Sequence, residues 1–101
     1  MDLKYEFLKI LELTNDKFYV PTEEHSSGFN QIEIYDMEDG TFSITEENGC
    51  CVDKYLTFEE IIAEYPKFTL SREFAFYNKF ETWDRLEKAL KGEIEIKLLE
   101  I

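Results

Sequence analysis

Residues 31–55 read QIEIYDMEDGTFSITEENGCCVDKY, and apolar residues in this stretch alternate with polar ones around two turn signals. Alternation with a period of two is typical of a strand that is buried on one face only. The turn signals are Asp39-Gly40 and Asn48-Gly49, both common in tight hairpins. The stretch therefore predicts a three-stranded antiparallel meander whose apolar residues are Ile32, Ile34, Phe42 and Ile44.

The length of the first turn decides which face each strand buries. A two-residue turn at 39–40 would place Ile34 opposite Thr45 and would turn the apolar residues of the second strand to the other face. A three-residue loop at 38–40 places Ile34 opposite Ile44 and brings all four apolar side chains to one face. We therefore expect the three-residue loop, with its glycine in the left-handed conformation that such a loop needs.

Three segments outside the meander predict helices. Asp2–Leu13 carries a helical apolar stripe, although the same residues also fit a strand. The clearest helix follows Thr57, which opens a capping box, and ends before Pro66. A further helix follows Thr82, buries Trp83, Leu86, Ala89 and Leu90 on one face, and stops at Gly92.

The remaining segments predict short strands and one loop. The strands outside the meander are Phe18–Val20, Glu73–Tyr77 and Glu93–Leu98, and the loop is Thr22–Asn30. The third strand of the meander itself is Cys50–Tyr55. Together the elements predict a single α+β domain over residues 1–101. Its core is a mainly antiparallel sheet, formed by the meander and further strands, with two or three helices packed on one face.

Charge is distributed unevenly along the chain. The 101 residues include 23 acidic and 11 basic ones, which gives a net charge of −12. Residues 1–66 hold 16 acids and 4 lysines and carry this whole charge, whereas 7 acids and 7 bases cancel in residues 67–101. Such a surface repels nucleic acid and anionic membranes and attracts basic proteins. The alternative interpretation is that the acidity only keeps the protein soluble.

No segment indicates a membrane-spanning or secreted protein. No apolar run approaches the roughly 20 residues of a membrane-spanning helix, and the first residues, MDLKYEF, lack the apolar region of a signal peptide. The 2 cysteines are adjacent and build no disulfide framework. We therefore expect a cytoplasmic protein.

The residue types that most often carry chemistry form no catalytic or metal-binding motif. His25 is the only histidine, and no serine or cysteine motif accompanies it. Cys50 and Cys51 have no second pair to complete a zinc site. Residues 36–40 (DMEDG) resemble a calcium loop, but the glycine is fifth rather than sixth and strands are expected on both sides. We therefore expect no cofactor, no metal and no enzyme activity.

These observations favour a small protein-binding inhibitor whose acidic surface occupies a basic partner. It would be an immunity protein for a nuclease toxin, or a nucleic-acid mimic that blocks a nucleic-acid-binding enzyme, because carboxylates compete for phosphate-binding Lys and Arg. The alternatives are an adaptor that uses an apolar patch or a sheet edge and, least favoured, an enzyme that uses only carboxylates. The candidate contact residues are Glu33, Asp36, Glu38, Asp39, Glu46, Glu47, Glu59, Glu60 and Glu64.

Overall fold

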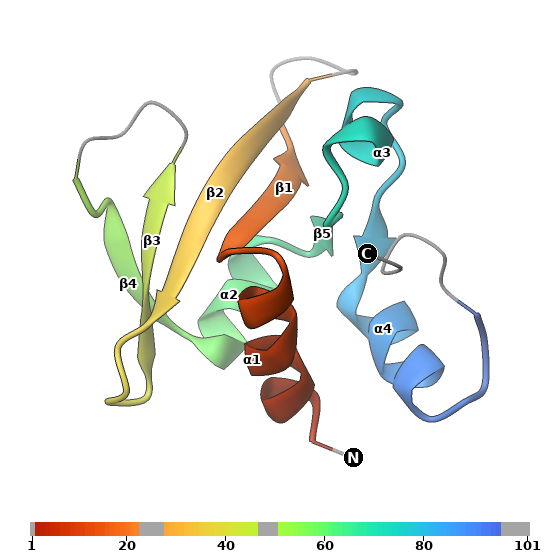
Figure 1. The fold of residues 1–101 in the computed structure, drawn as a ribbon, viewed down its shortest axis with the longest axis horizontal. Helices are drawn as coiled ribbons and strands as arrows, with labels where there is room; N and C mark the ends of the chain where they lie inside the picture. The colour runs from red at the N-terminus through yellow and green to blue at the C-terminus, as the bar shows by residue number, and fades with distance from the viewer. Residues whose placement is uncertain (1, 23–27, 47–50, 96–101) are drawn as a thin grey trace.

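Within residues 2–22, 28–46 and 51–95, which a computed structural model describes, the chain combines a four-stranded antiparallel sheet with four helices. The strands of this sheet follow one another in the order β1-β2-β3-β4, and β5 pairs with β6 in a separate two-stranded sheet (Figure 1). The predicted α+β class is confirmed. The elements are α1 (Leu3–Leu13), β1 (Lys17–Pro21), β2 (Phe29–Asp36), β3 (Thr41–Glu46), β4 (Lys54–Thr57), α2 (Phe58–Glu64), β5 (Lys67–Phe68), α3 (Arg72–Phe76), β6 (Glu81–Thr82) and α4 (Trp83–Leu90).

The hairpin between β2 and β3 has the predicted register. Ile34 lies opposite Ile44, and the N–H of Met37 donates to the carbonyl of Thr41 at 3.0 Å, which leaves a three-residue loop. Gly40 closes this loop with a φ of 94°, the left-handed region that glycine enters without strain. The four apolar residues of the two strands are at most 1% exposed. The alternation therefore predicted the buried face correctly.

Helices α1, α2 and α4 complete the core on the buried side of this sheet, and Figure 1 shows α1 and α2 beside each other there. Asp2 caps α1, because its carboxylate accepts the N–H of Lys4 at 3.0 Å. Phe7 and Leu11 are the buried residues of α1, as the helical stripe predicted. Phe58 and Ile61 are the corresponding residues of α2. The prediction of a helix at the N-terminal end is confirmed.

Trp83, the first residue of α4, joins the C-terminal segments to the sheet and to the first two helices. Its ring stacks on Phe68 with centroids 4.3 Å apart and meets Phe7 at 5.5 Å and Phe58 at 5.9 Å. The indole Nε1 donates a hydrogen bond to the carbonyl of Tyr65 at 2.6 Å. A buried tryptophan that is satisfied in this way contributes apolar area without leaving an unpaired donor.

Threonine caps begin α2 and α4, as predicted. The hydroxyl of Thr57 accepts the N–H of Glu60 at 3.2 Å, and the carboxylate of Glu60 accepts the N–H of Thr57 at 2.9 Å, which completes the capping box. The hydroxyl of Thr82 accepts the N–H of Arg85 at 3.3 Å. Helix α2 ends immediately before Tyr65 and Pro66, in accord with the restriction that proline places on its predecessor.

The end of α4 is confirmed, whereas the strand expected after it is wrong where the structure describes it. Gly92 adopts a φ of 78° and donates to the carbonyl of Ala89 at 3.0 Å, while Glu93 donates to that of Lys88 at 2.9 Å. These two bonds form the turn that commonly ends a helix at glycine. The first residues of the predicted strand Glu93–Leu98 therefore close the helix, and residues 93–95 form no strand.

The predicted strand Glu73–Tyr77 is also wrong, because this segment forms the short helix α3. The hydroxyl of Ser71 accepts the N–H of Phe74 at 3.4 Å and caps the first turn. Ala75 is the buried residue of this helix, and Phe76 and Tyr77 are exposed. A local side-chain cap thus outweighs the alternation of aromatic residues that indicated a strand.

The third strand of the meander begins later than predicted. Instead of Cys50–Tyr55, the strand is Lys54–Thr57. Asp53 precedes it and replaces a regular ladder pair, because its N–H donates to the carbonyl of Ile44 and its carboxylate accepts the N–H of Glu46 at 2.8 Å. The carboxylate of Asp53 therefore takes the place of a backbone carbonyl as the acceptor for the N–H of Glu46.

Two further predictions concern the loops. The loop expected over Thr22–Asn30 is too long at its C-terminal end, since β2 already begins at Phe29, which lies opposite Pro21. Several residues singled out in the sequence lie outside the residues that the structure describes: His25, Glu47, the turn Asn48-Gly49 and Cys50.

The two edges of the four-stranded sheet differ. At the β1 edge, Tyr19 and Thr69 exchange two backbone hydrogen bonds of 3.0 and 2.9 Å, which bridge this strand to the segment after β5. At the other edge, β4 pairs with β3 and has no second partner strand in the described parts of the chain. One edge is therefore covered and the other open.

Candidate partner-binding surface

Five of the nine predicted contact residues belong to two segments that meet at one end of the sheet, which we call the acidic end. The loop between β2 and β3 and the first turn of α2 are neighbours there, because Thr41 pairs with Thr57 across β3 and β4 (Figure 1). All five side chains are exposed. The residues of the acidic end are Asp36, Glu38 and Asp39 in the hairpin and Glu59 and Glu60 in α2.

Neutral donors hold the two aspartates of the hairpin in place. The carboxylate of Asp36 accepts the N–H of Glu38 at 2.9 Å. That of Asp39 accepts both the N–H of Thr41 at 2.9 Å and its hydroxyl at 2.5 Å. The hydroxyl of Thr41, and then its N–H, hold the pKa of Asp39 below its ordinary value. Because these donors carry no charge, they order the carboxylates and leave the negative charge in place.

None of the residues of the acidic end forms an ion pair with a base in the described chain. Glu60 uses its carboxylate in the capping box of α2, where the donor is again a neutral backbone group. Glu59 lies beside it in the first turn. A carboxylate in the first turn of a helix interacts favourably with the helix dipole.

One other predicted residue, Glu64, pairs with a lysine instead, and Glu46 acts on the neighbouring Tyr65. Lys54 pairs with Glu64, whose carboxylate lies 2.6 Å from Nζ, and its ammonium also lies 5.3 Å from the centre of the Tyr65 ring. The hydrogen bond with Glu64 is the main reason why the pKa of Lys54 is raised. Glu46 ends β3 and is close enough to raise the pKa of Tyr65, although burial is the larger cause of that shift. The ion pair with Lys54 thus partly cancels the charge of Glu64.

Glu33 lies on the face of the sheet that points away from the core. It is opposite Lys17 in the register of β1 and β2 and accepts the hydroxyl of Tyr35 at 2.7 Å. This hydrogen bond is the main cause that raises the pKa of Tyr35. Glu33 also raises the pKa of Asp16, after the larger effect of burial. The structure therefore separates Glu33, Glu46 and Glu64 from the acidic end.

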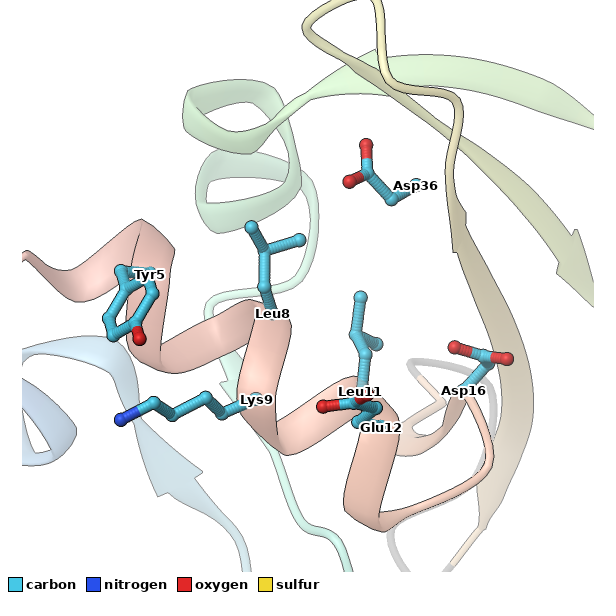
Figure 2. Close-up of a pocket in the computed structure, with 7 residues that line it drawn as sticks. All are labelled: Tyr5, Leu8, Lys9, Leu11, Glu12, Asp16 and Asp36. Carbon is cyan, nitrogen blue, oxygen red and sulfur yellow. The ribbon is translucent and has the colours of Figure 1, made fainter.

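A cavity of about 460 Å³ lies between α1 and the hairpin, next to the acidic end (Figure 2). Leu8 and Leu11 form its apolar part, and carboxylates of Glu12, Asp16 and Asp36 lie around it. Sequence reasoning missed Glu12 and Asp16. One signal was present for the helical side, since Tyr5, Leu8, Lys9 and Glu12 recur at the spacing of a single helix face.

The basic residues of α4 are paired with acids one turn away, so this helix adds little net charge. These contacts cancel charge locally, which agrees with the balance of residues 67–101 in the sequence. The pairs are Arg85 with Glu81 at 2.7 Å, Lys88 with Asp84 at 3.3 Å and Lys91 with Glu87 at 3.2 Å.

The described residues contain no group of three or more His, Cys, Asp or Glu side chains that could hold a metal ion. In the same part of the chain, no helix is both long and apolar enough to cross a bilayer. Comparisons with family models, with curated proteins and with solved structures give no significant match.

Proposed function

We propose that this chain is a non-catalytic inhibitor that binds a basic protein through its acidic end. The partner is a nuclease toxin, for which the chain acts as an immunity protein, or a nucleic-acid-binding enzyme that the chain blocks by mimicking nucleic acid. The observation that carries the proposal is that two neighbouring segments hold five exposed carboxylates, none of which has a basic counter-charge in the described chain.

The arrangement of these carboxylates suits competition for a phosphate-binding surface. Enzymes that act on nucleic acids present Lys and Arg to phosphates, and ordered carboxylates offer the same groups a different acceptor. Asp36 and Asp39 are ordered by their bonds to backbone N–H groups and a hydroxyl. Binding therefore requires little further ordering of these side chains, which lowers the entropic cost of association.

The experiment measures binding to, and inhibition of, a panel of purified basic nucleases, with basic proteins that do not bind nucleic acid as a comparison. The variant Asp36→Asn/Glu38→Gln/Asp39→Asn removes three charges from the acidic end. The control variant Glu81→Gln/Asp84→Asn/Glu87→Gln removes three charges from β6 and α4. We expect the first variant to lose affinity by tenfold or more and the control to lose much less, because paired carboxylates contribute little to the outer field.

Ionic strength gives a second readout of the same proposal. Binding through the acidic end should weaken steeply between about 50 and 200 mM salt, since exposed charges are screened over about a Debye length. Failure to bind any basic protein of the panel, or equal losses in the two triple variants, would count against the proposal.

A second candidate function is that of an adaptor, and the open β4 edge is the observation that favours it. An exposed strand edge can accept a strand of another protein by backbone hydrogen bonds. Such binding depends weakly on salt, and it should survive neutralisation of the acidic end. A partner retained in 500 mM salt by the Asp36→Asn/Glu38→Gln/Asp39→Asn variant would favour the adaptor.

A further inference from the structure

Two exposed tyrosines and a small residue form one row across β2, β3 and β4. Tyr35 lies opposite Ser43, and Ser43 lies opposite Tyr55. Because Ile34 and Ile44 point into the core, the row points to the opposite side of the sheet. The side chains of Tyr35 and Tyr55 are 42% and 58% exposed, whereas Ser43 is 3% exposed.

We call this row of three residues the tyrosine platform (Tyr35, Ser43 and Tyr55). Neighbouring strands lie about 4.8 Å apart, so the two tyrosines begin about 10 Å apart on either side of the serine. The hydroxyl of Tyr35 also donates to Glu33 at 2.7 Å, which holds that ring in place.

Charged residues of both signs border the tyrosine platform. Glu33 lies on the same face, bonded to Tyr35, and the hairpin of the acidic end follows Tyr35 directly along the chain. Lys54 precedes Tyr55 but points to the core side of the sheet, where it pairs with Glu64. Lys17, opposite Glu33, is the one base in register with this border among the described strands.

We propose that the tyrosine platform is the centre of the interface with the basic partner and that it receives an arginine of that partner. This inference rests on the proposed function and specifies the contact. An aromatic centre within a charged rim is the usual anatomy of a protein interface. Among basic side chains, arginine combines a positive charge with a flat face that stacks on tyrosine, which lysine lacks.

The test compares two unstructured peptides of equal length and charge, one of glycine and arginine and the other of glycine and lysine. Dissociation constants for the full chain are measured at 50 mM salt by calorimetry. We expect tighter binding of the arginine peptide, by about two- to fivefold for each ring that it contacts. The variant Tyr35→Leu/Tyr55→Leu keeps apolar area but removes both rings, and it should bind the two peptides equally.

A matched control comes from the other exposed aromatic pair. Phe76 and Tyr77 are 71% and 64% exposed at the end of α3, and the variant Phe76→Leu/Tyr77→Leu should keep the full preference for arginine. Circular dichroism confirms that each variant folds. Equal binding of both peptides by the unmodified chain, or loss of the preference in the Phe76 and Tyr77 variant alone, would overturn the inference.

Two further outcomes separate this inference from the proposed function. If neutralising the acidic end abolishes binding to a basic nuclease while the tyrosine variant binds it with unchanged affinity, the inhibitor proposal stands and the platform is not the contact. Sedimentation that shows a dimer, lost only in the tyrosine variant, would assign the platform to a second copy of this chain and overturn the inference. If no basic protein of the panel binds, the proposed function fails. If the chain also binds the two peptides with equal affinity, the inference about the tyrosine platform fails as well.

Discussion

The acidic end and helix α4 both carry exposed carboxylates, but these carboxylates have different partners. In α4, Asp84 and Glu87 each have a base one turn away. At the acidic end, Asp36 and Asp39 bond to backbone N–H groups and a hydroxyl. Both arrangements order the side chains, but only the ion pairs cancel the charge. The acidic end therefore carries negative charge that no ion pair in the described chain cancels, and composition alone does not give its position.

The two regions share one core, and removing its central residue should affect both. Trp83→Ala is expected to lower the free energy of unfolding by about 3–5 kcal/mol, because a buried tryptophan is lost and a cavity remains. Circular dichroism with urea denaturation gives the value. If the two regions were independent, Trp83→Ala would unfold the C-terminal segment first, and the transition would divide into two steps.

Matched caps allow the beginnings of the two helices to be compared. Thr57→Ala removes a reciprocal capping box and should cost about 1 kcal/mol of unfolding free energy. Thr82→Ala removes a single capping bond and should cost somewhat less. Urea denaturation of both variants measures the difference. A larger loss for Thr82→Ala would contradict the expectation that the reciprocal capping box is the stronger cap.

The ion pairs of α4 should have only a small effect on stability. Glu87→Gln removes the pair with Lys91 and should cost about 0.2–0.5 kcal/mol or less, because both side chains are about half exposed. Glu38→Gln at the acidic end breaks no ion pair and should cost nothing or stabilise slightly, since it relieves repulsion. Thermal unfolding at low salt distinguishes the two, and the difference should shrink in 0.5 M salt.

The smallest expected effect is a gain of stability at Asp16. Burial and then Glu33 raise the pKa of this carboxyl above 3.8, so its ionised form destabilises the folded state. Asp16→Asn should therefore stabilise the protein slightly at pH 7, and Asn tolerates the left-handed φ of 66° at this position. The gain is present above the raised pKa and should vanish as the pH falls through it to below 3.8. A gain that persists at pH 3 would contradict this cause.

Much of the fold could be predicted because its signals are local and agree with one another. The alternation around Ile34 and Ile44 fixed both the loop length and the buried face, and Thr57 and Gly92 marked helix ends by their own chemistry. Glu73–Tyr77 failed because aromatic alternation competed with the cap at Ser71, and the pattern alone does not say which prevails.

The candidate surface was predictable only in part, because it depends on which distant segments meet. Asp36, Glu38 and Asp39 are neighbours in sequence, so their proximity was evident. That their hairpin lies next to the start of α2 depends on the pairing of β3 with β4. The position of Asp16 depends on a hydrogen bond of 2.8 Å in which its carbonyl accepts the N–H of Ile34. No sequence pattern predicts this bond.

The burial of Trp83 gives the protein an internal optical reporter. It is the only tryptophan in the chain, it is 5% exposed, and its Nε1 donates to the carbonyl of Tyr65. Its emission should therefore shift to longer wavelength when the core opens. The acidic end and the tyrosine platform do not include this ring, so ligand titrations there should leave the emission maximum in place, and a red shift during a titration would report loss of structure rather than occupancy.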